Sequence, residues 1–276
     1  MFLEDYKIAQ ISDLHLSAHQ DKNAEHLRSV IHYINTSVQP QHVIVSGDLV
    51  DYDRSIEAYY FVRQQLDTLQ APYAVIPGNH DDCQALAIVF QDKFSFKDSR
   101  ATLDSVLNDM QSPLALIMLD SVITGETKGG CSPKQIHWLE EVCQSTDKPI
   151  LIFIHHPPLS FSTLDAHLRQ SIEAFNPALG EALEFLGAEH LAEMVQRYPT
   201  IKGLFCGHLH CAVQFLWQGK HFAVAPSIAP PHREFMFQRE TLAKLGIQVC
   251  EDPGLAIHTW NAQTESIKSD FVFCPL

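Results

Sequence analysis

The chain has 276 residues, 46% of them hydrophobic, so it can bury a large core as one big domain or as one domain with an appendage. Its formal net charge of -14 disfavours sustained contact with a phosphate backbone, and no basic stripe offsets it, so duplex nucleic acid is excluded as an expected partner. The seven cysteines are scattered and contain no CxxC pair, which is typical of reduced thiols rather than of a disulfide framework.

The apolar runs are short. The longest, Leu114 to Leu119 and Ile150 to Ile154, are far below the roughly 20 residues needed to cross a bilayer, so they are interpreted as buried strands. The first residues, Met1 to Asp5, are acidic where a signal peptide would be basic. We therefore expect a cytoplasmic protein with no membrane partner.

The first third of the chain alternates between two hydrophobic periods. Buried-strand patterns fall at 7–11, 42–45 and 74–76, and amphipathic helical patterns lie between them at 21–37 and 55–69. Strand, helix, strand, helix, strand at this spacing predicts parallel βαβ units and an α/β fold.

The middle of the chain continues this pattern less regularly. Strands are expected at 114–119, 150–154 and 202–206, and helices at 133–142 and 189–197. Between them, residues 159–186 are polar and irregular with scattered aromatic side chains. Long segments of this kind in compact domains are usually functional or disordered, so a lid near the site is expected.

The last part of the chain contains mostly short strand patterns. They fall at 213–216, 221–225, 247–250, 255–260 and 267–273, which favours antiparallel pairing. We expect a core over 1–210 with the lid inserted near 159–186, and a segment 211–276 that completes the second sheet and supplies cap or dimerisation strands.

The clearest candidate for chemistry follows a Pro77-Gly78 turn. Pro and Gly punctuate turns, so the side chains of Asn79, His80 and Asp81 should be exposed at the tip of a buried strand. Such a turn is a weak signal alone, but four other strand-like runs end in the same kind of side chain.

Together, five strand ends offer ligands for a divalent cation. The candidate ligands are Asp13, His15, Asp48, Asn79, His155, His208 and His210. Because strand ends on one edge of a parallel sheet converge on a shared crevice, residues nearly two hundred positions apart can meet there. Carboxylate, amide and imidazole donors without thiolates suit Mn, Fe, Co or Zn. Two such ions need a shared carboxylate, and Asp48 is the natural bridge.

These residues resemble the motifs of the calcineurin-like metallophosphoesterases. The matching blocks, in chain order, are Asp13-Leu14-His15, Gly47-Asp48-Leu49-Val50-Asp51, Gly78-Asn79-His80-Asp81, His155-His156-Pro157 and Gly207-His208-Leu209-His210. The resemblance is strongest to the bacterial class III cyclic nucleotide phosphodiesterases and the related glycerophosphodiesterases. It implies a four-layer α/β sandwich, two mixed β-sheets flanked by helices.

The resemblance also implies how the ligands divide. One metal would be held by Asp13, His15, Asp48 and His210, and a second by Asp48, Asn79, His155 and His208.

A mechanism follows as a hypothesis from this ligand set. A hydroxide bridging the two ions attacks phosphorus, and His80 assists the departing alkoxide. Asp51 and Asp81 are both candidates for orienting His80. Asn79 and His156 are candidate contacts to substrate, although His156 could equally pack beside His155.

Several alternatives remain open at this point. Cyclic AMP is the first choice of substrate because of overall resemblance, with a glycerophosphodiester or a phosphomonoester on the same metals as alternatives, and a non-catalytic scaffold as a third class. The other histidines are expected to be structural or exposed. Aromatic residues near the carboxyl end favour a homodimer: Phe235, Phe237, Trp260, Phe271 and Phe273.

Overall fold

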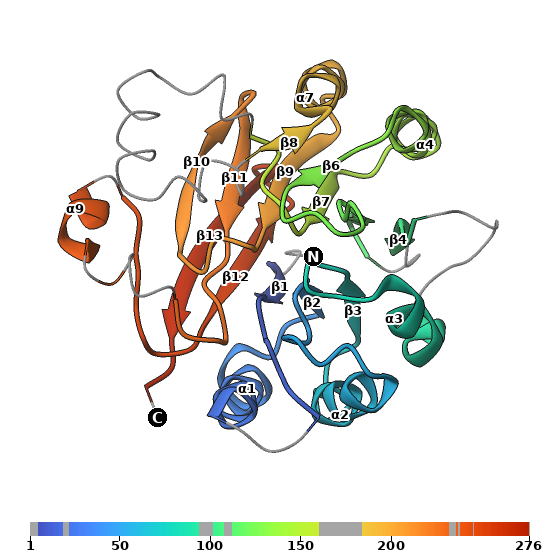
Figure 1. The fold of residues 1–276 in the computed structure, drawn as a ribbon. Helices are drawn as coiled ribbons and strands as arrows, with labels where there is room; N and C mark the ends of the chain where they lie inside the picture. The colour runs from blue at the N-terminus through green and yellow to red at the C-terminus, as the bar shows by residue number, and fades with distance from the viewer. Residues whose placement is uncertain are drawn as a thin grey trace.

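A computed structural model of the chain describes residues 5–18, 22–93, 102–107, 112–159, 184–231, 236, 238–244 and 246–275. Two β-sheets lie face to face, and helices cover the outer face of each (Figure 1). The expected lid near 159–186 lies almost wholly outside the described residues.

The first sheet has five strands in the order β13-β12-β1-β2-β3. Their bounds are Tyr6–Ile11 for β1, His42–Ser46 for β2, Tyr73–Ile76 for β3, Gly254–Asn261 for β12 and Ser266–Phe273 for β13. The strands β1, β2 and β3 are parallel, whereas β12 runs antiparallel to both β1 and β13. The three parallel strands therefore present their carboxyl ends at one edge.

The second sheet has six strands in the order β10-β11-β9-β7-β5-β4. Their bounds are Ser105–Leu107 for β4, Ala115–Leu119 for β5, Ile150–Ile154 for β7, Ile201–Cys206 for β9, Val213–Trp217 for β10 and Lys220–Val224 for β11. The four inner strands are parallel, and the two edge strands are antiparallel to their neighbours. A small parallel pair joins β6 (Gly129–Gly130) to β8 (Phe185–Leu186).

Helices begin where the sequence supplies caps. Ser55 accepts a hydrogen bond from the Ala58 amide at the start of α2, and Ser132 forms a capping box with Gln135 at the start of α4. The described helices are α1 (Lys22–Tyr33, continued by the π-helix η1, Ile34–Val38), α2 (Ile56–Leu66), α3 (Cys83–Val89), the 3-10 helix η2 (Gln91–Lys93), α4 (Pro133–Gln144), α7 (Ala188–Arg197) and α9 (Arg239–Lys244).

Three apolar clusters separate these four layers. Side chains of a strand alternate between faces, so on β1 Ala9 and Ile11 pack toward the helices α1, α2 and α3 while Ile8 packs toward the other sheet. On β7, Ile152 packs toward the helices of the second sheet, and Phe153 lies between the sheets. The expected four-layer α/β sandwich is confirmed.

Some expected elements differ. Residues 247–250 form a single bridge, in which Gln248 and Ala212 exchange two backbone hydrogen bonds of 2.8 Å, because four alternating residues do not distinguish a strand from one bridge. The strands after residue 210 are shared between the sheets, since β12 and β13 extend the first sheet and β10 and β11 the second. The sequence analysis missed the short elements α3 and β4.

The aromatic residues near the carboxyl end are not all available to a partner. Trp260 is 2% exposed and packs between the sheets, so that residue was wrongly assigned to a dimer surface. Phe235 and Phe237 lie outside the described residues, and the homodimer stays a prediction. Among the described residues no helix is both long and apolar enough to cross a membrane.

Candidate metal centre

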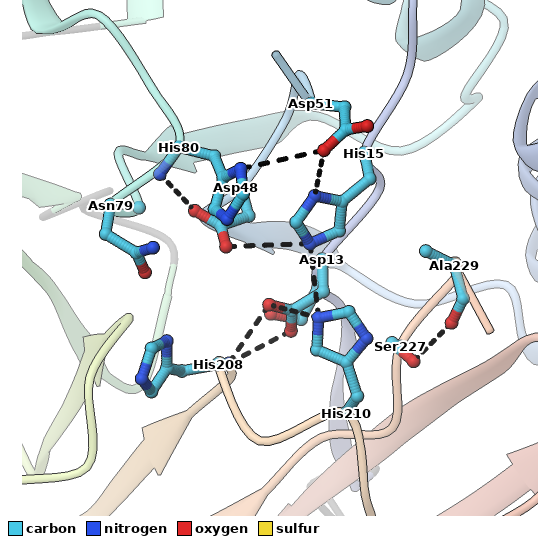
Figure 2. A network of polar contacts seen from close by, with 12 residues as sticks. Asp13, His15, Asp48, Asp51, Asn79, His80, His208, His210, Ser227 and Ala229 are labelled. Atoms are coloured by element: carbon cyan, nitrogen blue, oxygen red, sulfur yellow. Dashed lines mark hydrogen bonds and ion pairs between the residues drawn. The ribbon is translucent and has the colours of Figure 1, made fainter. Parts of the chain in front are cut away.

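The candidate ligands occupy loops at the carboxyl ends of β1, β2, β3, β7 and β9. Asp13, His15 and Asp48 follow strands of the first sheet, whereas His208 and His210 follow β9 of the second (Figure 2). In Figure 2 the side chains of Asp13, His15, Asp48 and His210 point toward one another, and the ring of His208 points toward the side where Asn79 lies. The site therefore forms where the ends of the two sheets meet.

The loops after β1 and β2 are joined by backbone hydrogen bonds. The Asp13 amide donates to the Gly47 carbonyl and the His15 amide donates to the Asp48 carbonyl, both at 3.0 Å. Asp13, His15 and Asp48 all have left-handed backbone, with φ of 53°, 45° and 51°. Non-glycine residues rarely adopt this conformation, and its cost of about 1–3 kcal/mol per residue is typical of functional sites.

The loop after β9 shows the same strain. His208 and His210 have φ of 71° and 49°, so five of the eight non-glycine residues with positive φ in the described chain are candidate ligands. The His208 amide donates to both oxygens of the Asp13 carboxylate, at 3.2 and 3.0 Å. This contact ties the loop of the second sheet to the loop of the first.

Glycines allow these loops to approach one another. A Cβ atom added at Gly47, which has φ of +99°, would lie 2.2 Å from Nδ1 of His155. A Cβ added at Gly78 would lie 2.2 Å from Oδ1 of Asp48. A side chain at either position would displace a candidate ligand.

One group of donor atoms surrounds His15. Its Nε2 lies 3.1 Å from Nε2 of His210 and 3.6 Å from Oδ2 of Asp48, and Nε2 of His210 lies 3.5 Å from Oδ1 of Asp13. Ligand atoms about 2.0–2.2 Å from one cation lie about 3.0–3.6 Å from each other around a tetrahedron or an octahedron. Asp13, His15 and His210 therefore have the mutual spacing of ligands to a single ion, and Asp48 lies beside His15.

A second group shares Asp48. Nε2 of His155 lies 3.5 Å from Oδ2 of Asp48 and 3.3 Å from Oδ1 of Asn79. Donor atoms of His208, His155 and His156 also lie within 4.8 Å of one another. Asp48, 2% exposed, thus lies between two groups of donors, as a carboxylate shared by two cations must.

Three imidazoles have their second nitrogen occupied by an oxygen atom. Nδ1 of His155 lies 2.7 Å from the Ser46 carbonyl, Nδ1 of His210 lies 3.3 Å from the Pro230 carbonyl, and Nδ1 of His15 lies 3.6 Å from Oδ1 of Asp51. Metal-binding histidines characteristically donate their outer N–H in this way, which leaves the other nitrogen free for the ion. The donor set and its surroundings fit two divalent cations.

In the absence of a cation, Asp48 and His155 stabilise each other's charged forms. Burial opposes ionisation of Asp48, but the nearby charge and hydrogen bond of His155 hold the pKa of that carboxyl well below its usual range. Burial likewise opposes protonation of His155, and the attraction of Asp48 outweighs it, raising the pKa of His155 to about 9. A cation that binds here would displace this proton.

His80 lies at the edge of the centre. Its amide donates a 2.8 Å hydrogen bond to Oδ1 of Asp48, while its Nδ1 lies 3.6 Å from Oδ1 of Asp51. The hydrogen bond from His15 lowers the pKa of Asp51, so this half-exposed carboxylate is ionised near neutral pH. Tyr52, which the sequence analysis missed, is 87% exposed and has its ring centroid 5.9 Å from that of His80.

Asp81 has other contacts than the expected one with His80. Its buried carboxylate accepts hydrogen bonds from the amides of Gly78 and Leu49 and from the Tyr59 hydroxyl, at 2.8, 3.1 and 3.2 Å. Burial, reinforced by the charge of Asp48, raises the pKa of Asp81 to about 6. Of the two carboxylates considered for orienting His80, Asp51 lies beside it, and Asp81 holds two loops together.

His156 is buried beside the centre. Its Nδ1 lies 2.8 Å from the hydroxyl of Ser121, and its Nε2 has no hydrogen-bond partner among the described residues. Burial and the neighbouring imidazoles of His208 and His155 keep the pKa of His156 well below its usual value, so it is neutral. Ser121 was missed, although the polar pair that it forms with Asp120 directly after β5 repeats the strand-end signal.

Residues outside the centre fit the structural interpretation. His26 and His258 are fully buried away from the ligand loops, and His137 is on an exposed helix face. Cys206 and Cys211, which flank the last motif, are buried. None of the seven cysteines forms a disulfide.

Comparison with known proteins agrees with this geometry. The chain is 29% identical over 264 residues to a probable glycerophosphodiester phosphodiesterase of Arcobacter nitrofigilis, covering 93% of this chain and 89% of that protein. It is 26% identical over 231 residues to a 3',5'-cyclic adenosine monophosphate phosphodiesterase of Escherichia coli strain K12, covering 80% of this chain and 75% of that protein.

The fold also matches a solved structure. A dimetal phosphatase from Danio rerio superposes with a TM-score of 0.64 and 14% identity, covering 98% of this chain and 99% of that one. The family model described as calcineurin-like phosphoesterase matches residues 6–212. This chain therefore belongs to the calcineurin-like phosphoesterase family, and it is a metallophosphoesterase.

Proposed function

We propose that this chain hydrolyses a small phosphodiester with the help of two divalent cations. The cations would be held by the seven candidate ligands Asp13, His15, Asp48, Asn79, His155, His208 and His210, and Mn, Fe, Zn and Co suit these donors. The observation that carries the proposal is the shared position of Asp48 between two groups of donors, at 3.6 Å from His15 and 3.5 Å from His155.

The metals would supply charge that polarises the phosphate oxygens and acidifies water. The chain itself would fix their ligands. Because Ser46 and Pro230 accept the Nδ1 protons of His155 and His210, these rings would keep Nε2 directed at the cations throughout turnover.

His80 is proposed to act on the leaving group. Its side chain is 27% exposed and its amide is anchored to Asp48, so the ring lies at the rim of the centre where a substrate would enter. Asp51 lies 3.6 Å from Nδ1 of His80, which would hold the ring in place. A protonated His80 could donate its proton from Nε2 to the departing alkoxide oxygen.

Two substrate classes are candidates. A 3',5'-cyclic nucleotide such as cyclic AMP is the first, in line with the Escherichia coli relative. A glycerophosphodiester is the second, and it is favoured by the longer match to the Arcobacter nitrofigilis relative, which covers 93% of this chain. Asn79 and His156 are proposed substrate contacts in either case.

Activity assays on reconstituted protein test the proposal. Chelated protein is loaded with Mn²⁺, its metal content is measured, and bis-p-nitrophenyl phosphate is compared with p-nitrophenyl phosphate. We expect two ions per chain and preference for the diester. Strong preference for the monoester would replace the proposal by a phosphomonoesterase, and two bound ions without activity would support a scaffold. Cyclic AMP and glycerophosphocholine then separate the two diester classes.

A further inference from the structure

A chain of polar side chains crosses the otherwise apolar space between the sheets. His258 of β12 is fully buried, and its Nδ1 lies 2.7 Å from the Ser269 hydroxyl, which also lies 2.7 Å from Nε2 of His221. Nε2 of His258 lies 2.8 Å from Oε1 of Gln10. The surrounding side chains, including Phe153 and Phe205, are apolar, so these polar groups must satisfy one another.

The hydrogen atoms along this chain can be assigned. The amide nitrogen of Gln10 donates to the Cys206 carbonyl at 3.0 Å, and a carbonyl can only accept. The oxygen of Gln10 must then accept from Nε2–H of His258. Because burial lowers the pKa of His258 well below its usual value, the ring is neutral and its Nδ1 accepts from Ser269. This order fixes one neutral tautomer of His258 and one orientation of the Gln10 amide.

Gln10 contacts both sheets at the ends of the strands that lead into the candidate ligand loops. Its amide nitrogen also donates to the Ser46 hydroxyl at 2.7 Å. Ser46 is the last residue of β2 and Cys206 is the last residue of β9, so each immediately precedes a glycine and a candidate ligand. The Ser46 carbonyl in turn accepts the 2.7 Å hydrogen bond from His155.

We propose that Gln10 is a positioning residue of the metal centre, held in its orientation by His258. Its amide joins the ends of β2 and β9, so it sets how far the Asp48 loop lies from the His208 loop. It also fixes Ser46, whose carbonyl orients His155. The inference rests on the proposed two-metal site, because it concerns how that site is held.

Replacing the amide by an apolar side chain of similar size tests this inference. Gln10→Met keeps the size of the side chain, but it removes the hydrogen bonds of the amide to the Ser46 hydroxyl and the Cys206 carbonyl at the ends of β2 and β9. We expect Mn²⁺ affinity to fall about tenfold, the low end of the effect of groups that support metal ligands. We also expect the exchange coupling between the two Mn²⁺ ions, measured by electron paramagnetic resonance, to change because their separation changes.

A matched core variant separates positioning from stability. Ile44→Val removes a buried methyl group from the same layer without touching the amide, so it should lower the melting temperature and leave both metal readouts unchanged. If Gln10→Met lowers the melting temperature but keeps wild-type affinity and coupling, the inference is wrong. Wild-type protein that binds fewer than two ions would instead contradict the proposed function.

Variants of His258 provide a second route if Gln10→Met does not fold. Gln at position 258 can place an N–H near the position of Nε2 and so keep the donor to Gln10, whereas Leu cannot. We expect His258→Gln to retain wild-type metal affinity and His258→Leu to lose about tenfold. Equal affinities in the two variants would overturn the role of His258.

Discussion

The two halves of the metal centre are built from different donors. The first sheet contributes oxygen atoms from Asp13, Asp48 and Asn79 together with one imidazole, and its loops are tied to each other by backbone hydrogen bonds. The second sheet contributes imidazoles alone, from the loops after β7 and β9. Neither half holds a complete ligand set, so the centre depends on how the sheets pack against each other.

Two carboxylates of the first half make the contacts that join the halves. The carboxylate of Asp13 accepts from the amide of His208, and that of Asp48 lies beside His155. Each carboxylate of the first half is therefore both a candidate ligand and a contact to the second half. Substitutions in the two halves should thus differ in effect, which the following predictions test.

The largest effect is expected for Asp48→Asn, which removes the charge shared by both donor groups. Metal ions contribute several kcal/mol of transition-state stabilisation, and each 1.36 kcal/mol is a factor of ten in rate. We expect kcat/KM for the diester to fall about a thousandfold, with fewer than two ions bound. Steady-state kinetics and metal analysis measure both quantities.

A surface carboxylate provides the control for this variant. Asp147→Asn makes the same chemical change at an exposed position far from the ligand loops, and it should leave activity unchanged. Two bound ions and wild-type activity in Asp48→Asn would contradict the bridging position of this residue.

A smaller effect is expected for His80→Ala, which changes the first half without removing a ligand. General acid catalysis contributes about 10²–10⁴-fold, so kcat should fall about a hundredfold while both ions remain bound. The loss should be smaller for bis-p-nitrophenyl phosphate than for an alkyl diester, because p-nitrophenolate leaves without a proton.

The exposed His137, whose side chain is 72% accessible, gives the matched control. His137→Ala should retain full activity with both substrates. An equal loss for both leaving groups in His80→Ala would show that this residue does not protonate the departing oxygen.

Much of the centre could be predicted because strand ends are visible in sequence. The strands before Asp13, Asp48, Asn79, His155 and His208 are short apolar runs that stop at a polar residue, and parallel pairing brings such ends to one edge. The candidate ligands can therefore be found one strand at a time, without any knowledge of how the sheets pack.

The supporting contacts could not be predicted in this way. Whether Asp51 or Asp81 faces His80 depends on the turn after Gly78, where the Asp81 carboxylate folds back onto backbone amides. The contact between Gln10 and His258 joins residues 248 positions apart on adjacent strands of the first sheet. Periodicity assigns a residue to a face of its sheet, but it does not say which side chain of another strand lies opposite.

A change in the second half should have a modest effect. Ser121→Ala removes the hydroxyl that lies 2.8 Å from Nδ1 of His156, so the ring loses the contact that fixes its orientation. We expect KM for the diester to rise about tenfold with little change in metal content, as is typical for groups that orient a functional side chain. Ser145→Ala, at an exposed helix end, is the control, and equal KM values in the two variants would exclude this role.

The smallest effect is expected on the free energy of unfolding, through the protonation of His258 at low pH. Burial, with a small contribution from the charge of His221, keeps the pKa of His258 well below its usual value of about 6.5. Below pH 6.5 the unfolded chain therefore binds a proton at this position that the folded chain does not. The stability that His258 contributes is complete above pH 6.5 and is lost as the pH falls, at up to about 1.4 kcal/mol per pH unit.

Denaturation of metal-free protein between pH 7.5 and pH 5.5, about one unit on either side of the pKa of a free histidine, measures this loss. Wild-type protein should lose stability more steeply than His258→Gln, which keeps the hydrogen bond to Gln10 but cannot be protonated. His221 also has its pKa lowered by burial and contacts the same serine, so His221→Gln determines its share of the slope. Parallel slopes for wild type and His258→Gln would mean that protonation of His258 does not destabilise the fold, and the pH dependence would then come from other groups.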